Sequence, residues 1–380
     1  GLYDTEAKLM IFQQDVVLSN PDYRLESGEL IYNIITKHAR TTNYTEITTN
    51  NGRKLFAQQG SEFDTSKKTS AFLSGEIDTE SYYIKAGELF YDQLNRYYSA
   101  SVDVYVYGKS DNIIITGDHA RFYEDTGVAE VFGNPVLRKP MLEDTLFLSA
   151  DTLVSIDSKN AEEKRLLAYN NVMVYKWDIQ GKADSMAYFI QDSLIFLYTN
   201  PVLWNAGSQI SADSINLVVS KGTIERMNTS VNSFIISLDS VDNFNQIKGR
   251  KMTAWFKGSN IETVDVNGNG ESIYFALDEE NSNQLVGMNY ILCSDMKISF
   301  KDNKLNSIKL YPKSDASFAP PHEIKESERT LKDFDWRIDE RPLKEDVIQH
   351  TRFTEYEKPA VEQDAPTTDE LLPVKLVESE

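Results

Sequence analysis

The stretch from Asp144 to Trp204 contains two similar copies of one sequence unit, and this repetition constrains the fold more than any other feature. The first copy reads DTLFLSADTLVSIDSKNAEEKRLLAYNNVMVYK and the second WDIQGKADSMAYFIQDSLIFLYTNPVLW. Each copy passes through alternating apolar residues to an Ala-Asp pair, continues in alternation, turns on polar residues and ends on Asn followed by Val. Self-similarity at a fixed period is typical of repeat arrays, so we interpret the chain as such an array.

The position of the Ala-Asp pair recurs at regular intervals along the chain. The residues that occupy it are Ser27, Gln59, Ala86, Gly117, Ala150, Ala183 and Ala212, at intervals of 27 to 33 residues. The next two residues at this position are Lys251 and Ser294, and they follow after longer intervals, as is usual for terminal units. We therefore expect about nine units of roughly 30 residues over residues 1–312. A division into sub-arrays 1–220 and 221–312 stays open.

The body of the array is expected to be all-β. The 20 Tyr and 18 Phe residues stand in short alternating runs, which is typical of half-buried strands. No window of helical length before Pro312 has a clean helical period of apolar residues. Each unit is long enough for two or three strands with short turns between them.

Alternation shifts by one residue at the Ala-Asp step. Ile179 and Ala183 share one face, whereas Met186 and Tyr188 lie an odd number of positions further on. If both sets face the same interior, the strand must contain a bulge or a sharp corner at this step. We expect the small residue inside the corner and the Asp outside it, accepting backbone N–H groups.

The pattern changes after Pro312. Four apolar residues, Ile324, Leu331, Phe334 and Ile338, follow at roughly helical spacing, which predicts a short amphipathic helix that ends at Arg341-Pro342. From Glu345 onward the chain is acidic, contains scattered Pro and has little to bury, which predicts an extended or disordered tail. Residues 313–380 are therefore expected to form a Pro-containing acidic extension with a short helix.

Charge and motif content argue against several functions. The formal charge of −20 would repel nucleic acid. The sequence has no phosphate loop, nucleophile elbow or zinc pattern, and its four His residues are isolated from one another. The single Cys293 is expected to be a small buried hydrophobe. We therefore expect no enzyme activity, no catalytic residues, no metal and no cofactor.

One Asp recurs per unit, at Asp118, Asp151, Asp184 and Asp213, and such a column invites comparison with calcium-binding repeats. Those repeats have much shorter periods dense in Gly and Asp. Stacked carboxylates without further oxygen ligands would mainly repel one another. We favour corner capping over a calcium site.

The tandem pattern of [Ile/Leu]-x-[Ala/Gly]-Asp followed by Asn-x-Val resembles the OstA-like proteins, relatives of the periplasmic lipopolysaccharide-transport protein LptA. The match is best from Gly117 to Val219 and extends from Leu25 to Tyr311. The added length and the acidic C-terminal region resemble the larger OstA-like proteins of Bacteroidetes-type bacteria.

The resemblance implies an elongated β-jelly-roll or taco-shaped solenoid whose apolar groove shields the acyl chains of lipid A on the way to the outer membrane. Implied partners are lipopolysaccharide, LptC-like and LptD-like proteins docked on edge strands, and further copies of the chain end to end. The implied lipid-facing residues are Ile115, Ala120, Phe122, Leu148, Leu153, Ile179, Met186, Tyr188, Ile210, Ile215 and Leu217.

A periplasmic location is expected on the same grounds, with possible association with the outer membrane. The chain begins at Gly1 without an initiator Met, so we expect any signal peptide to lie upstream. No stretch of the sequence approaches 18 apolar residues.

Two other functions stay open from sequence. One is a structural or adhesin-like array with a filled core and no ligand. The other is a carbohydrate-active enzyme on a β-helix, which would need shorter coils and several carboxylates at one level. An apolar interior too wide for its own side chains would favour the lipid carrier over the structural array.

Overall fold

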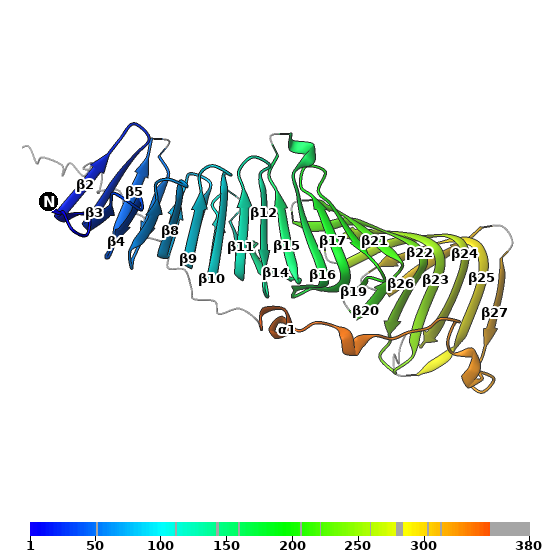
Figure 1. The fold of residues 1–380 in the computed structure, drawn as a ribbon. Coiled ribbons are helices and arrows are strands. Elements are labelled where there is room, and N and C mark those ends of the chain that lie inside the picture. The colour runs from blue at the N-terminus through cyan, green and yellow to red at the C-terminus, as the bar shows by residue number, and fades with distance from the viewer. Residues whose placement is uncertain are drawn as a thin grey trace, which may run out of the picture.

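The computed structural model describes residues 1–349 apart from 51, 111, 142–143, 159, 206, 221, 259, 279–283, 302–303 and 312–313. The strands form one long antiparallel array that runs from β2 at the N-terminal end to β27 at the other end (Figure 1). The all-β jelly-roll expectation is confirmed. No helix within these residues has the length and apolar character needed to span a membrane.

The strands follow one another in a single sheet. In chain order they are β1 (Leu2–Asp4), β2 (Leu9–Ser19), β3 (Tyr23–Asn33), β4 (His38–Thr41), β5 (Thr45–Thr49), β6 (Lys54–Ala57), β7 (Ser61–Asp64), β8 (Thr69–Asp78), β9 (Tyr82–Asp92), β10 (Tyr97–Gly108), β11 (Ile113–Tyr123), β12 (Val128–Phe132), β13 (Val136–Pro140), β14 (Thr145–Ser149), β15 (Thr152–Ile156), β16 (Arg165–Lys176), β17 (Ile179–Phe189), β18 (Leu194–Tyr198), β19 (Val202–Asn205), β20 (Ser208–Ser211), β21 (Ser214–Ser220), β22 (Thr223–Leu238), β23 (Phe244–Lys257), β24 (Asn260–Leu277), β25 (Leu285–Lys301), β26 (Lys304–Leu310) and β27 (Asp315–Ala319). A 3₁₀ turn, η1 (Ala161–Glu163), lies between β15 and β16.

The sheet folds into two layers along a lengthwise corner. We call layer 1 the half that contains β4, β7, β12, β15, β18, β21 and β26, and layer 2 the half that contains β5, β6, β13, β14, β19, β20 and β27. Long strands pass through the corner, so β17 pairs with β19 through residues 179–182 and with β18 through residues 185–189. The short strands therefore alternate between layers, and the long strands tie the layers together.

The corner contains the expected break in register. Between β16 and β17 the pairing jumps from Tyr169–Ser185 to Val172–Ala183, so Asn170 and Asn171 stand opposite the single residue Asp184. The extra residue of the bulge therefore lies on the strand that neighbours the Ala-Asp step. Similar jumps occur in β2, β10, β22 and β24, which makes the bulge a repeated element of the array.

The apolar residues of both layers meet between them. One cluster joins layer 1 residues such as Leu153 and Met252 to layer 2 residues such as Leu148 and Ile235. A second cluster, nearer the N-terminus, joins Phe72 and Leu89 of layer 1 to Leu55 of layer 2. The interior between the layers is thus a continuous apolar zone. The proposed division at residue 220 stays a prediction.

The predicted amphipathic helix over 324–338 is wrong in position. This segment is extended and contains two 3₁₀ turns, η2 (Glu326–Glu328) and η3 (Ile338–Glu340). The helix α1 (Lys344–Ile348) begins after Pro342 and not before it, and it includes residues that we assigned to the tail. A Pro just ahead of the first helical turn removes no helical hydrogen bond. The rest of the predicted tail, residues 350–380, lies outside the described residues.

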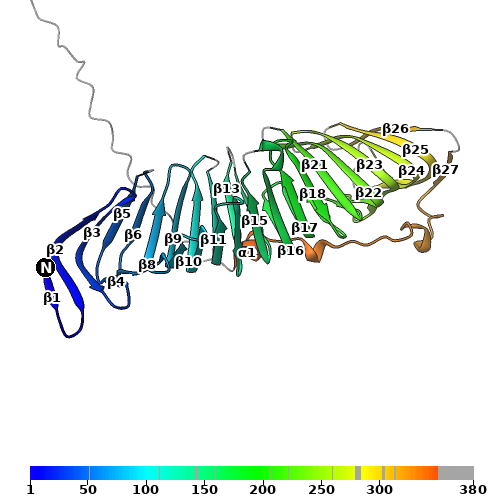
Figure 2. The same cartoon turned by 45° about the horizontal axis from the view of Figure 1, so that its top comes forward.

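Residues 320–348, which we call the strap, return along the outer face of layer 2 (Figure 2). Leu331, Phe334 and Trp336 pack against an outer cluster that includes Phe234 and Phe275. Further back, α1 packs on β14 and β16. The apolar residues of this segment therefore pack on the sheet from an extended backbone. Their spacing does not reflect a helix.

Three buried glutamines of layer 2 hold the strap. Gln246 donates to the Arg329 carbonyl at 2.8 Å and accepts from the Leu331 N–H at 2.8 Å. Gln209 makes the same pair of bonds to the Asp335 carbonyl and the Arg337 N–H, both at 2.7 Å. Gln180 accepts from Arg341 Nε at 2.7 Å. The side-chain amides of Gln209 and Gln246 thus bind backbone groups of the strap that a neighbouring strand would bind in a sheet.

Candidate functional site

The apolar interior between the layers is the candidate site, because most of the predicted lipid-facing residues lie in it. Ten of these eleven residues have large side chains. Six of the eleven are buried there: Leu148, Leu153, Met186, Ile210, Ile215 and Leu217. Ile115 is half-buried and packs against the same cluster, while Ala120 and Phe122 are half-buried against the N-terminal cluster. Ile179 and Tyr188 are half-buried. Whether any of them contacts lipid stays a prediction.

Alternation along the strands brings these residues together from both layers. Leu148 and Ile210 stand on layer 2, where β14 and β20 carry them, whereas Leu153 and Met186 stand on layer 1. Strict alternation would place Ala183 and Met186 on opposite faces, because they are three residues apart. The change of register at the corner lets both face inward. The interior is filled by these side chains in the structure, and a ligand would have to displace contacts between the layers.

Sequence reasoning missed the interior residues of the C-terminal part. Met252, Val264, Val266, Met296 and Ile298 belong to the same buried cluster. Their strands alternate as clearly as those of the central units, so periodicity in the longer terminal units was the available signal. The interior therefore continues beyond the stretch that carries the resemblance.

The recurring Asp residues sit outside the corner, where they bind Asn side chains. The amide of Asn171 donates to both carboxylate oxygens of Asp151 at 3.1 Å. Asn232 donates to Asp213 at 3.0 Å and Asn134 to Asp118 at 3.3 Å. We had expected backbone N–H donors at these carboxylates, and in these three the donor is an Asn side-chain amide. Asn134 and Asn171 belong to the recurring Asn-Val part of the repeat, which the sequence analysis noted without linking it to the Asp.

Potential metal ligands and the thiol can be located in the described part of the chain. Within it, no group of three or more His, Cys, Asp or Glu side chains lies close enough to hold a metal ion. Cys293 is buried, and burial, followed by the nearby Asp295 carboxylate, raises the pKa of its thiol. A raised pKa keeps the thiol protonated and unreactive.

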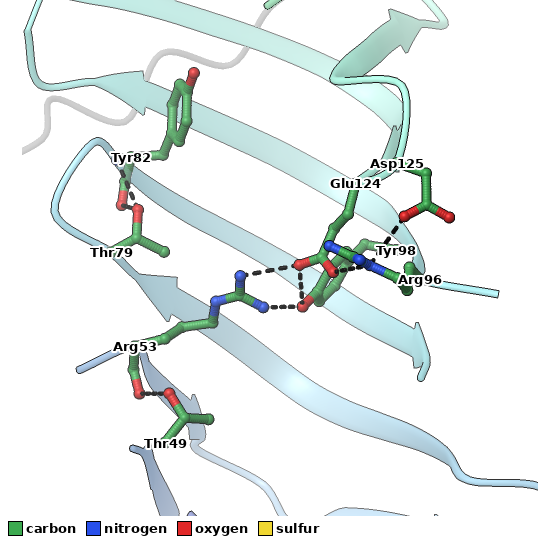
Figure 3. A network of polar contacts seen from close by, with 8 residues as sticks. All are labelled: Thr49, Arg53, Thr79, Tyr82, Arg96, Tyr98, Glu124 and Asp125. Atoms are coloured by element: carbon green, nitrogen blue, oxygen red, sulfur yellow. Dashed lines mark hydrogen bonds and ion pairs between the residues drawn. The ribbon is translucent and has the colours of Figure 1, made fainter. Parts of the chain in front are cut away.

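The two layers also approach each other on the side opposite the corner, along the two rims formed by the turns. Arg53, in the β5–β6 turn of layer 2, reaches layer 1 and pairs with Glu124 at 2.9 Å, while its guanidinium also donates to the Tyr98 hydroxyl (Figure 3). Tyr98 donates to the same carboxylate at 3.1 Å, and Arg96 binds it at 3.3 Å. One carboxylate thus gathers two guanidinium groups and a phenol at the rim.

Burial sets the protonation of this cluster. It raises the pKa of Tyr98 far above its ordinary range, so the phenol stays neutral and acts as a donor to Glu124. Burial alone would lower the pKa of Arg53, but Tyr98 and Glu124 outweigh it and the net direction is upward. The side chains of Arg53 and Glu124 are 25% and 13% exposed, so this ion pair is partly shielded from water and from salt.

Further contacts between described residues join the rims along the array. The Tyr82 hydroxyl, at the start of β9 in layer 2, donates to Asp157, which follows β15 in layer 1, at 3.2 Å. The Met141 methyl of layer 2 lies so close to Gly222 of layer 1 that a Cβ there would stand 2.7 Å from it. In each case the layer 1 partner comes some 70 to 80 residues later in the chain, with separations of 71 and 75 residues in the first two.

Fold and interior together define a class: an elongated two-layer β-jelly roll whose apolar interior is bounded by a hydrogen-bonded corner on one side and by side-chain contacts between rims on the other.

Within this class, residues 114–223 match the family model described as LptA/(LptD N-terminal domain) LPS transport protein. This match supports the resemblance of that stretch to OstA-like and LptA-like proteins. A solved structure, the LptH protein described as the LptA homologous periplasmic component of the conserved lipopolysaccharide transport device from Pseudomonas aeruginosa, is similar at 15% identity and a TM-score of 0.27. The alignment covers 31% of this chain and 82% of LptH. No curated protein matches the chain.

Proposed function

We propose that this protein is a non-enzymatic periplasmic carrier that shields the acyl chains of lipopolysaccharide between its two layers during transport to the outer membrane. The observation that carries the proposal is the apolar interior to which both layers contribute, with side-chain contacts between the described rim residues on the side opposite the corner. The family of residues 114–223 supports lipopolysaccharide as the cargo.

The physical gain from such shielding is large. Removing one methylene from water is worth about 0.8 kcal/mol, so a chain of about 14 carbons gains on the order of 10 kcal/mol before ordering costs. Since the interior is filled, part of this gain is offset by the contacts that the ligand displaces. Parting of the layers is therefore part of binding under this proposal.

The ends of the array supply the edges for partner proteins. At the N-terminal end, β1 covers only Leu9 to Ile11 of β2, and Val17 and Leu18 further along β2 are exposed. At the other end, β26 and β27 pair with β25, and within the described residues they have no further strand beyond them. Open edges of this kind allow strand addition, and we propose LptC-like or LptD-like proteins, or a second copy, as partners.

A structural array with a filled core and no ligand is the second candidate. Burial of Leu153, Ile210 and Ile215 to 1% exposure favours it, because a standing groove would leave such residues accessible. The two candidates differ in whether the layers part for lipid.

Photocrosslinking from inside and outside separates the candidates. Photoreactive residues at Phe122 and Tyr188 would report on the interior, and one at Tyr169, which is 44% exposed on layer 1, serves as the matched outer control. Crosslinks to radiolabelled lipopolysaccharide at the two interior positions but not at Tyr169, together with a lipid adduct in native mass spectrometry, are the expected result. Lipid-free protein with no interior crosslink would establish the structural array.

A further inference from the structure

Three contacts between the rims, which we call the latches, join residues that lie far apart in the sequence. They are Arg53 with Tyr98 and Glu124, Tyr82 with Asp157, and Met141 over Gly222. Along the corner the layers are joined by continuous strands, but at the latches no strand passes from one layer to the other. Parting the rims therefore breaks side-chain contacts and leaves every backbone ladder intact.

We propose that the latches close a side entrance to the interior, and that an amphiphile with acyl chains enters between the rims when the latches part. This inference rests on the proposed function for its cargo, but the closing role of the latches is a property of the protein alone. The entrance lies along the rims from Arg53 to Gly222, above both apolar clusters.

The latches differ in the number and kind of their contacts, so the rims are expected to part first where the contacts are weakest. The Arg53 latch combines an ion pair with Glu124, a hydrogen bond from the guanidinium to the Tyr98 hydroxyl, and a guanidinium carbon 5.5 Å from the centre of the Tyr98 ring. Tyr98 is also fixed from below, because its ring stacks on Tyr91 with centroids 4.2 Å apart. The Tyr82 latch includes a hydrogen bond between exposed groups, and the Met141 latch is an apolar contact. The Arg53 latch is thus the firm end of the entrance, and the rims part more readily towards Gly222.

The filled interior explains why such an entrance is needed. Tyr98 belongs to the N-terminal apolar cluster and Arg53 lies above it, so the latch stands directly between solvent and the buried side chains. A ligand that entered from the open ends would have to push through the packed interior lengthwise. A ligand that entered between the rims would separate the two faces once and at one side.

The first experiment measures the rims without any lipid. Spin labels at Ser81→Cys on layer 2 and Thr126→Cys on layer 1, in a Cys293→Ala background, report the distance across the mouth by pulsed electron resonance. Arg53→Met is expected to broaden and lengthen this distance, and the double exchange Arg53→Glu with Glu124→Arg is expected to restore most of it. Arg24→Met is the matched control, because Arg24 pairs with Glu26 on its own strand and does not cross the mouth. An unchanged distance in Arg53→Met would refute the closing role.

The second experiment locks the entrance. Arg53→Cys and Glu124→Cys, joined by a short bismaleimide, hold the rims together, and the same double variant treated with a single-headed maleimide is the control. Uptake of lipopolysaccharide from micelles is expected to be at least ten times slower in the locked protein, and faster than wild type in Arg53→Met. Equal uptake by locked and control proteins would overturn the side entrance while leaving the carrier function intact. If wild type takes up no lipopolysaccharide, the proposed function fails, and the distance measurement still decides on the latches.

Discussion

An asparagine at each corner answers two needs at once. Asn171 has a φ of 52°, in the left-handed region that Asn tolerates better than other residues with a side chain, and its amide binds Asp151. Asn134 and Asn232, with φ of 51° and 52°, do the same for Asp118 and Asp213. The repeated Asp was recognisable from sequence as a corner residue. Its partner was not, because the two lie about 20 residues apart and only the fold brings them together.

Substitutions at Asn171 separate these two needs. Asn171→Gly keeps the left-handed backbone and loses only the exposed amide bonds, so we expect a loss below about 1 kcal/mol in the free energy of unfolding. Asn171→Ala adds the cost of a Cβ in the left-handed region, and we expect a loss of about 1–3 kcal/mol. Urea unfolding of both variants measures the difference. Equal losses would mean that the backbone conformation contributes nothing.

Asp151→Asn tests the corner against the calcium alternative. The carboxylate binds an amide, so the variant is expected to lose about 1 kcal/mol and to show the same melting temperature with calcium and with a chelator. A stabilisation by calcium that is present in the wild type and lost in the variant would contradict corner capping.

At the scale of elements, the strap shows where periodicity misleads. The spacing of its apolar residues fitted a helix, yet Phe334 and Trp336 face the sheet together as alternate residues of an extended chain. The buried glutamines that hold it, Gln209 and Gln246, are fully buried and lie in strands far from it in sequence. Short strands, turns and bulges follow from local pattern, but docking of a segment on a sheet depends on partners more than 80 residues away.

Removing one glutamine should weaken the strap. Gln209→Leu leaves the Asp335 carbonyl and the Arg337 N–H without their partner, and we expect a loss of about 1–3 kcal/mol in the free energy of unfolding. Gln58→Leu is the control, because Gln58 is exposed. Hydrogen exchange over residues 320–348 should rise in the first variant alone. Unchanged protection there would show that apolar packing holds the strap by itself.

The strap should also loosen in acid. Hydrogen bonds from Arg337, and then from Lys182, lower the pKa of Glu340 to about 2 from an ordinary 4.5. A depressed folded pKa stabilises the fold above the ordinary value, and this contribution fades as pH falls from about 4.5 towards 2. The stability difference between wild type and Glu340→Gln is therefore expected to shrink from pH 6 to pH 3 in urea unfolding. A difference that stays constant with pH would contradict the assignment.

At the scale of the whole molecule, the repeat predicted an elongated all-β array and the inward set of its central strands. Sequence could not predict how the layers meet at the rims, because Arg53 and Glu124 lie more than two repeats apart. A local period fixes each strand's neighbours but not the tilt of one layer over the other. The rim contacts of Arg53, Tyr82 and Met141 each join a layer 2 residue to a layer 1 residue further along the chain.

Deleting residues 320–380 should change the behaviour of the whole molecule. The deletion exposes Phe234, Ile236 and Phe275 on the outer face of layer 2, so we expect self-association and increased binding of an apolar dye. Light scattering after size exclusion measures the mass. A chain that lacks only residues 350–380 keeps the strap and is the control. A monomeric, dye-free deletion protein would show that this face tolerates water.

The glutamine contacts have a consequence for how this chain can change over generations. Gln209 and Gln246 recognise the strap through its peptide groups, so most strap side chains can be exchanged without disturbing these bonds. Each glutamine, by contrast, has no substitute of equal length that both donates and accepts. In a saturation mutagenesis screen for folded protein, substitutions should be tolerated least at Gln209, Gln246 and Leu331. Most other strap residues should accept substitutions.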